Sequence, residues 1–316
     1  MPRPVILGIV GDSATGKTTI SGALVEILGD EQVTHVATDD YHKYDREERK
    51  QREITPLHPD CNYMDIIGQH LSLIRDGEPI LKPVYKHGDG TFGPPEYVAS
   101  RPFAVVEGLL GYHTEGLRES YDVRVFLSPP EELRRKWKIK RDTAKRGYTE
   151  DDVHKDLDKR EPDSAEFIRP QERYADLVIK FMENEGGDPD KLDAQIIMRE
   201  TLPHPDLSPF LSDPKNGIEL IEEGPDPYVR IPGEIKHENA EAIEDAIWEH
   251  LHFASHLRSE RLGQFSAGKE TKRSDSLALV QLLVLYHMVT ARAAVSIGGE
   301  SARTDDSNGA DDDEQS

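Results

Sequence analysis

A glycine-rich segment near the start of the chain carries the strongest chemical signal. Residues 11–18 read Gly-Asp-Ser-Ala-Thr-Gly-Lys-Thr, which fits the phosphate-loop pattern G-x-x-x-x-G-K-[ST]. In this pattern the glycines let backbone N–H groups turn toward an anion, the lysine adds a charge at the outer phosphates, and the last hydroxyl can hold Mg²⁺. The segment predicts a site for a nucleoside triphosphate and Mg²⁺, lined by Gly11, Asp12, Ser13, Ala14, Thr15, Gly16, Lys17, Thr18 and Thr19.

Asp39 is the candidate general base. It directly follows residues 33–38, a predicted strand, and a carboxylate there, beside a phosphate loop, can accept the proton of an attacking hydroxyl. Its neighbour Asp40 is the rival, but consecutive residues leave a strand on opposite faces. His42 and Arg46 stand three and seven residues after Asp39, so a helix here would place them on its face, where they could hold an anionic acceptor. The alternative is a charged, solvated turn.

Glu107 is the candidate metal ligand that would act together with Thr18. It follows residues 104–106, which form a third predicted strand. Open α/β sheets bind their ligands at the carboxyl ends of the strands, and an acid at that end often reaches the bound metal. The alternative is that Glu107 only caps the loop that follows.

A strongly basic segment interrupts this acidic chain. Residues 134–146 carry eight cations and one acid, and Gly147 is placed to end the helix. Lys138, Asp142 and Arg146 fall near one face, and Arg141 lies beside them. Such a cluster can clamp nucleotide phosphates, a sugar phosphate, or both. The alternative is a solvated basic face that is paired with local acids.

Short apolar segments, most of them rich in β-branched residues, predict buried strands. They comprise residues 5–10, 33–38, 104–106, 123–127 and 177–179, and helical stretches such as 18–28, 65–75 and 131–145 separate most of them. Strands that alternate with helices predict an α/β fold: a P-loop NTPase-type, mostly parallel sheet flanked by helices.

Composition excludes several classes of protein. The 61 acidic and 39 basic residues give a net charge of −22, which disfavours nucleic acid as a partner because phosphate is repelled. The single cysteine, Cys61, excludes an intramolecular disulfide. The acid excess is typical of proteins from a salt-rich cytoplasm, so we expect a halophilic organism such as an archaeon; the alternative is an ordinary acidic protein.

No segment predicts export or a membrane span. The first ten residues have no long apolar stretch of the signal-peptide type. Residues 277–297 are long and apolar, but Gln281, His287 and Arg292 interrupt them, which favours a buried helix packed on the sheet. We therefore expect a cytoplasmic protein without a membrane partner.

Together these motifs resemble the phosphoribulokinase/uridine kinase family, and within it the phosphoribulokinases. The resemblance runs clearly over residues 5–179 and more weakly to about 295. The segments that carry it are the phosphate loop, Asp39-Asp40-Tyr41-His42 with Asp45-Arg46, Glu107-Gly108-Leu109, Trp137 to Asp142, Arg146 to Thr149, Arg160 to Asp163, and Pro170 to Asp176.

The resemblance implies ATP- and Mg²⁺-dependent transfer of a phosphoryl group to ribulose 5-phosphate, which gives ribulose 1,5-bisphosphate. Its implied residue roles, in this numbering, are as follows: Asp39 as catalytic base; Lys17, Lys138 and Asp142 as catalytic-site residues; Arg141 with the ATP phosphates; His42, Arg46 and Arg146 with the sugar phosphate; Thr18 and Glu107 with Mg²⁺. The resemblance also implies a homodimer and a helix hairpin that closes as a lid.

The composition changes near residue 205, where Pro203, Pro205, Pro209 and Pro214 indicate irregular chain, and residues 239–257 then predict a helix. We expect a P-loop kinase domain over residues 1–205, a C-terminal α+β extension packed on it over 206–297, and an acidic disordered tail over 298–316. The family's photosynthetic enzymes carry regulatory cysteines where this chain has Thr15 and Ala37, so we expect no thiol switch. A halophile-like composition also does not suggest a photosynthetic organism, which leaves the identity of the pentose phosphate open.

Three alternatives stay open from the sequence. The acceptor could be another pentose phosphate, such as ribose 1-phosphate, or uridine. A P-loop ATPase or regulatory nucleotide-binding protein is a different class; a GTPase would need an N-K-x-D segment, which the sequence lacks. A catalytically inactive member is disfavoured because Lys17, Asp39, Glu107 and Asp142 are all present.

Overall fold

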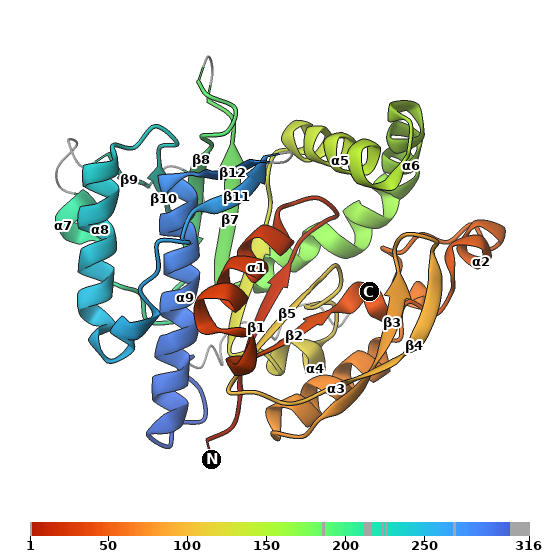
Figure 1. Ribbon diagram of the computed structural model, residues 1–316, viewed down its shortest axis with the longest axis horizontal. Coiled ribbons are helices and arrows are strands. Elements are labelled where there is room, and N and C mark those ends of the chain that lie inside the picture. The colour runs from red at the N-terminus through yellow and green to blue at the C-terminus, as the bar shows by residue number, and fades with distance from the viewer. Residues whose placement is uncertain are drawn as a thin grey trace.

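The computed structural model describes residues 2–184, 187–211, 217–222, 224, 226–267 and 270–303, except the side chains of residues 145, 146, 252, 253, 266 and 267. An eight-stranded sheet with the order β2-β5-β1-β6-β7-β8-β10-β9 forms its centre (Figure 1). The first five strands in this order are parallel: β2 (Val33–Ala37), β5 (Phe103–Gly108), β1 (Val5–Val10), β6 (Val123–Leu127) and β7 (Leu177–Met182). The remaining three strands each pair antiparallel with the strand before them in this order: β8 (Asp193–Met198), β10 (Tyr228–Ile231) and β9 (Glu219–Ile221). The predicted α/β class with a mostly parallel sheet is confirmed.

Helices cover both faces of this sheet, which explains why its central strands are mostly apolar. All six residues of β1 are buried, and they alternate between two cores: Val5, Leu7 and Ile9 face one, while Ile6 and Val10 face the other. The first core includes α1 (Lys17–Leu28), α8 (His237–His250) and α9 (Asp275–Ser296), and the second includes α3 (Met64–Arg75) and α4 (Glu115–Glu119).

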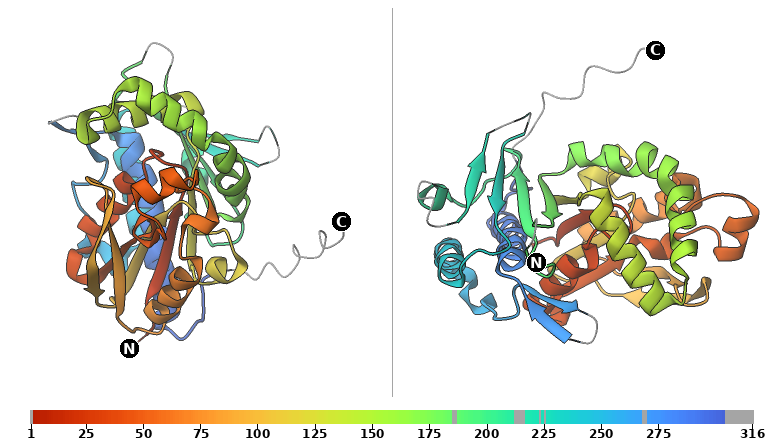
Figure 2. Two further views of the ribbon diagram at one scale, coloured as in Figure 1. Left: turned by 90° about the vertical axis from the view of Figure 1, so that its right-hand side faces the viewer. Right: turned by 90° about the horizontal axis from the view of Figure 1, so that it is seen from above.

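A helical hairpin stands at the carboxyl ends of the parallel strands (Figure 2). It consists of α5 (Glu131–Arg146) and α6 (Glu150–Asp163), which we call the lid helices. Gly147 ends α5 in the left-handed conformation, with φ of 72°, and Thr149 opens α6 with a capping box. A π-helical turn (Ser164–Ile168) and a 3₁₀ segment (Arg169–Tyr174) then lead into β7.

The segment after β2 is not one continuous helix. The shared helix face predicted for Asp39, His42 and Arg46 required such a helix, so that prediction is wrong. Residues Thr38–Tyr41 form a 3₁₀ turn, His42 is extended, and α2 (Arg46–Gln51) begins only after Asp45 caps it. A hairpin of β3 (Ile80–Lys86) and β4 (Thr91–Val98) packs against this turn. These short elements, and not a continuous helix, position the predicted acceptor residues.

Residues 206–297 continue the sheet and the first core. They supply α7 (Ser208–Leu211), β9, β10, α8, the hairpin β11 (Gln264–Ala267)–β12 (Glu270–Arg273), and α9. The helix expected to run to Leu257 stops at His250, where Leu251 leaves helical geometry and a 3₁₀ turn (His252–Leu257) follows.

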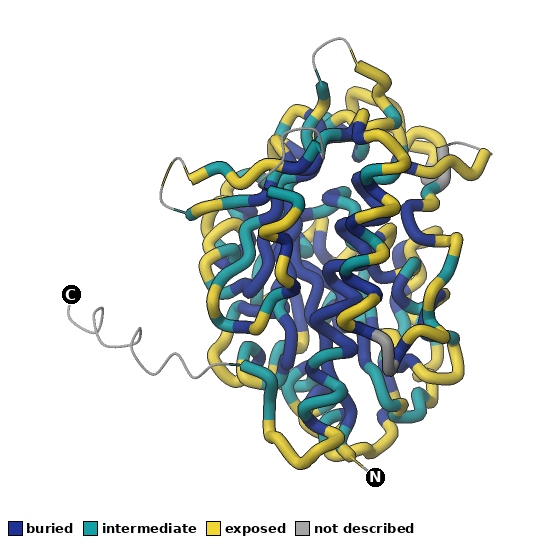
Figure 3. Tube along the Cα trace, turned by 90° about the vertical axis from the view of Figure 1, so that its left-hand side faces the viewer, coloured by how far each residue is buried: buried dark blue, intermediate teal, exposed yellow. Residues whose placement is uncertain are grey.

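Of the described residues, only α9 is long and apolar enough to cross a bilayer, and 72% of its apolar window is buried in the structure. Figure 3 shows how far each residue along the chain is buried. Most of the tail predicted to be disordered, residues 304–316, lies outside the described part. Residues 298–303 are described, and Arg303 binds the buried carboxylate of Asp176 at 2.6 Å.

Candidate active site

The phosphate loop leads from β1 into α1. Lys17 Nζ donates to the backbone oxygens of Gly11 and Asp12, both at 2.7 Å, and Thr15 Oγ1 donates to Asp12 O at 3.0 Å. Burial lowers the pKa of Lys17, while the carboxylates of Asp39 and Glu107 act in the opposite direction. No side chain caps the start of α1, so the positive end of this helix is open to an anion.

Thr18 and Glu107 lie together at the end of the loop, as the sequence predicts. Thr18 Oγ1 is 3.3 Å from Glu107 Oε2 and 3.4 Å from Oε1. Hydroxyl and carboxylate oxygens are ligands that Mg²⁺ prefers, so these residues fit that ion. His35 Nε2 on β2 is 3.5 Å from Glu107 Oε1, a neighbour that the motifs did not indicate. Among the described side chains no group of three His, Cys, Asp or Glu could hold a metal, so Mg²⁺ would need phosphate oxygens as further ligands.

Asp39 interacts electrostatically with residues of both the phosphate loop and the predicted acceptor side. Burial by itself would raise the pKa of Asp39, but the charges of His42, Lys17, His87 and Arg141 outweigh it, so the pKa is lowered. The carboxylate is therefore ionised near neutral pH. An ionised carboxylate at this place can take a proton from a hydroxyl.

Asp40 has a different set of partners. Its carboxylate forms an ion pair with Lys82 on β3 and accepts a hydrogen bond from the backbone N–H of Tyr85 at 2.8 Å. The side chain of Asp40 thus fixes the β3–β4 hairpin, and its proton-accepting oxygens are occupied.

The acceptor side is built from three segments. His42 is buried and its Nδ1 lies 2.7 Å from Asn62 Oδ1, while burial lowers the pKa of His42. Arg46 opens α2 and donates to the backbone oxygens of His87 at 2.6 Å and Gly88 at 3.4 Å, so it contacts the hairpin tip. Arg49, also on α2, binds the hydroxyl of Tyr85 on β3.

Sequence reasoning missed His87 and Arg49. His87 follows β3 at the tip of the β3–β4 hairpin, and Arg49 binds this hairpin through Tyr85; neither contact leaves a spacing signal in the sequence.

The lid helices bring the basic cluster over the loop. Lys138 is 2% exposed, and its Nζ lies 2.8 Å from Asp142 Oδ2 and 3.1 Å from Asp156 Oδ2 on α6. Arg141 bridges Asp142 Oδ1 at 2.8 Å and Ser13 Oγ of the phosphate loop at 3.2 Å. Burial would raise the pKa of Asp142, but its hydrogen bonds from Arg141 and Lys138 lower it to about 2. The side chain of Arg146 lies outside the described residues.

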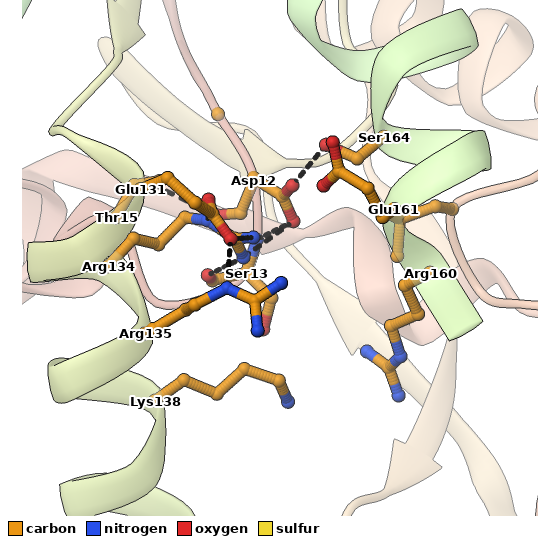
Figure 4. Close-up of polar contacts among 12 residues, drawn as sticks. Asp12, Ser13, Thr15, Glu131, Arg134, Arg135, Lys138, Arg160, Glu161 and Ser164 are labelled. Atoms are coloured by element: carbon orange, nitrogen blue, oxygen red, sulfur yellow. Dashed lines mark hydrogen bonds and ion pairs between the residues drawn. The ribbon is translucent and has the colours of Figure 1, made fainter. Parts of the chain in front are cut away.

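Asp12 has partners that the loop motif did not indicate. Its carboxylate lies 3.4 Å from the Arg134 guanidinium of α5 and accepts the Ser164 hydroxyl from the turn after α6 (Figure 4). The side chain of Asp12 therefore contacts the lid segments, although it belongs to the predicted nucleotide-binding loop.

Comparisons with known proteins agree with the motifs. Residues 6–186 match the model of the phosphoribulokinase/uridine kinase family. A phosphoribulokinase of Synechocystis is 38% identical over 182 residues, which is 58% of this chain and 55% of that protein. The chloroplastic phosphoribulokinase of Triticum aestivum is 32% identical over 222 residues, or 63% and 54%. The chain thus spans about half the length of these curated relatives.

Two further matches bear on acceptor class and on fold. A uridine kinase of Chloroflexus aggregans is 30% identical over 183 residues, which cover 56% of this chain and 87% of that protein. A solved structure of phosphoribulokinase from Rhodobacter spheroides superposes with a TM-score of 0.60 at 18% identity, and covers 81% of this chain and 99% of that one. At that identity the likeness concerns the fold.

Proposed function

The chain belongs to the phosphoribulokinase/uridine kinase family, and on this premise we propose that it transfers the γ-phosphoryl group of ATP to ribulose 5-phosphate, forming ribulose 1,5-bisphosphate. One observation carries the proposal. The half-buried carboxylate of Asp39 interacts electrostatically with Lys17 of the phosphate loop and with His42 and His87 of the acceptor side. A base that acts at both a triphosphate site and an acceptor site is what phosphoryl transfer to an alcohol requires.

The proposal gives each of the site residues a specific role in that reaction. Asp39 accepts the proton of the sugar hydroxyl as its oxygen bonds to the γ-phosphorus, and ADP leaves. Lys17 and Arg141 hold phosphate oxygens, so that the charge on them is balanced through the transfer. Thr18 and Glu107 would hold Mg²⁺, which neutralises phosphate charge when bound. Lys138 and Asp142 keep Arg141 above the loop.

The acceptor side favours an anionic sugar. His42, Arg46 and Arg146 are the predicted ligands of the sugar phosphate, and Arg46 is held at the hairpin tip by two backbone oxygens. A nucleoside would need an apolar base pocket, and it has no phosphate to balance the charge of the two arginines. Uridine remains the second candidate, because a uridine kinase matches this chain over 87% of its own length.

An ADP-release assay with a panel of acceptors tests the proposal. Purified protein, ATP and Mg²⁺ in high KCl are combined with ribulose 5-phosphate, ribose 1-phosphate or uridine. We expect the highest kcat/KM with ribulose 5-phosphate. A higher kcat/KM with ribose 1-phosphate or uridine would show that this compound is the acceptor in the same phosphoryl transfer. ADP release that no acceptor stimulates would instead favour an ATPase or regulatory nucleotide-binding protein.

We also infer that the enzyme works in the cytoplasm on a soluble substrate and forms a homodimer. The burial of α9 in the first core supports a place away from the bilayer. Light scattering coupled to size-exclusion chromatography tests the dimer: a mass of about twice 35.6 kDa is expected.

A further inference from the structure

The side chain of Asp12 joins three separate segments at one point. Its Oδ1 lies 3.4 Å from Nη1 of Arg134 on α5, and its Oδ2 accepts the hydroxyl of Ser164 in the turn that ends α6. Oδ1 also accepts the backbone N–H of Ser13. All three side chains are buried: Asp12 is 8% exposed, Arg134 5% and Ser164 2%. Figure 4 shows these groups converging between the lid helices and the loop.

The next loop residue makes a second pair of contacts with the same helix. Arg134 Nη1 donates to Ser13 O at 3.2 Å, and Arg141 Nη2 donates to Ser13 Oγ at 3.2 Å. Arg134 and Arg141 are seven residues apart, so they lie on one face of α5, separated by about 10 Å along its axis. Arg134 therefore contacts both Asp12 and Ser13, and Arg141, two turns further along the same face, contacts Ser13 as well.

We propose that Asp12 is a positioning residue whose carboxylate joins the phosphate loop to both lid helices, so that the loop determines where Arg141 and Lys138 stand. The inference rests on the proposed nucleotide site. It assigns the carboxylate of Asp12 no contact with the nucleotide, because Oδ1 is already bound to Arg134 and the Ser13 N–H, and Oδ2 to Ser164.

The contacts beyond Asp12 reach the residues that act on the phosphates. Arg141 contacts Asp142, which in turn holds Lys138, and Lys138 reaches Asp156 on α6. A shift of residues 12 and 13 on phosphate binding would therefore be passed to this cluster through Arg134 and Arg141. Because the joint consists of buried charged and polar groups, it has one well-defined geometry, which an apolar contact would not impose.

A spectroscopic signal for this coupling exists in the chain. Trp137 lies on α5 between the two arginines, and a β-carbon built on Gly16 of the loop would be 4.0 Å from its ring. The chain has one other tryptophan, Trp248, which is buried on α8 in the first core. In a Trp248→Phe background the emission of Trp137 therefore reports on the contact between lid and loop.

The test combines this signal with steady-state kinetics. Asp12→Asn keeps the shape and an oxygen for Ser164 but removes the charge that faces Arg134. We expect ADP to bind with a dissociation constant within about threefold of the parent, while the Trp137 emission change is largely lost and kcat falls about tenfold or more at nearly constant KM for ATP. Ser164→Ala should give a smaller loss of the same kind.

Arg135→Gln is the matched control. Arg135 also lies on α5 and binds Glu131 and Asp158, so it links the two lid helices without contacting the loop. We expect the Trp137 emission change and the kcat of Arg135→Gln to equal those of the parent. The double variant Asp12→Asn, Arg134→Gln should be no slower than the slower single variant, because the two residues act as one unit.

The opposing outcomes are distinct. An Asp12→Asn protein with normal kcat and a full emission change would overturn the inference, as would an ADP affinity that falls in proportion to kcat, since Asp12 would then bind the nucleotide. If Asp12→Asn does not fold, Ser164→Ala carries the same test: parent-like emission and kcat would overturn the inference. A parent protein that binds no ADP would overturn the proposed function as well.

Discussion

Asp39 and Asp40 are adjacent in the sequence but have different partners, and this difference favours Asp39 as the proposed base. Asp39 interacts with Lys17 and His42, whereas Asp40 is bound to Lys82 and to the Tyr85 backbone. Asp39→Asn keeps the size of the side chain but cannot take a proton. We expect kcat to fall by about 10²–10⁴-fold. The KM for ATP should change little, because Lys17 and the loop amides are unaltered; the ADP-release assay measures both constants.

Asp40→Asn is the control for this experiment. Because Asp40 anchors Lys82, we expect its loss to lower the free energy of unfolding by about 1–3 kcal/mol while kcat is largely kept. Urea unfolding of the two variants separates these effects. If Asp40→Asn loses kcat and Asp39→Asn does not, Asp40 is the base.

Cys61 is the chain's one thiol, and its surroundings make it unreactive. Burial raises the pKa of Cys61 to about 11, so below about pH 10 the side chain stays a protonated thiol, which is a poor nucleophile. We expect no reaction with Ellman's reagent at pH 8 in the folded protein and one reactive thiol per chain in guanidinium. Oxidant and dithiothreitol should leave activity nearly unchanged. A many-fold reversible loss of rate that Cys61→Ser abolishes would show a thiol switch.

At the residue scale, the sequence predicted the residues that the topology of the parallel sheet places. The proximity of Thr18 and Glu107 follows from the topology: β1 and β5 are adjacent parallel strands, Glu107 stands at the carboxyl end of β5, and Thr18 lies in the first turn of the helix that follows β1. Ser164 and His87 could not be found in this way. They reach the site from the turn after α6 and from a hairpin tip, and neither placement leaves a periodic signal in the sequence.

At the scale of elements, the strands buried on both faces were predictable and the exposed ones were not. β1 is apolar throughout, and β2 and β5 are apolar except for Thr34, His35 and Glu107, because helices cover the sheet. β4 is mostly exposed and contains Pro94 and Pro95, and β3 contains Pro83, so neither strand has an apolar alternation. The β3–β4 hairpin nevertheless holds Asp40, Arg46 and Arg49 in place.

This hairpin gives a test of Arg46. Arg46 stands at the hairpin tip, where Gly90 adopts φ of 80° and a β-carbon on it would meet the arginine side chain at 2.5 Å. If its guanidinium also binds the sugar phosphate, Arg46→Ala should raise the KM for ribulose 5-phosphate about 10–100-fold, the loss expected for one charge-assisted hydrogen bond, with little change in kcat.

Arg52→Ala is the control for Arg46. Arg52 ends the same helix, α2, and its guanidinium stacks on the ring of Tyr44 at 4.3 Å. Arg52→Ala should leave the KM for ribulose 5-phosphate unchanged. An unchanged KM in Arg46→Ala would mean that this guanidinium serves only to fix the hairpin.

At the scale of the whole molecule, residues 206–297 share one sheet and one core with the phosphate loop. β10 pairs with β8, α9 packs on β1, and the buried amide of Gln281 on α9 donates to Thr19 O in the first turn of α1. The change of composition near residue 205 suggested an extension that packs on the core. It gave no sign that the sheet itself continues, because β9 and β10 have three and four residues and little apolar pattern.

The net charge of −22 predicts that stability depends on salt over the whole molecule. The 61 acids exceed the 39 bases, and exposed pairs such as Lys191–Glu234 offset only local charge. Repulsion among the remaining acids acts over about 10 Å at 0.1 M salt and about 3 Å at 1 M. We expect the melting temperature and the activity to rise together as KCl is raised from 0.1 to 1 M and beyond, by about 2–4 °C for each kcal/mol of repulsion removed.

Sucrose at matched osmolality separates this screening from exclusion effects, because it carries no charge and stabilises compact states by being excluded from the protein surface. KCl should then raise the melting temperature well above the value in sucrose, most steeply below 1 M, where the Debye length changes most. Equal curves in the two solutes, or full activity with an unchanged melting temperature in dilute buffer, would show that the acids are spaced widely enough not to repel one another. The acidic composition would then carry no sign of a salt-rich cytoplasm, whereas the phosphate loop, Asp39 and the lid contacts would support the same chemistry as before.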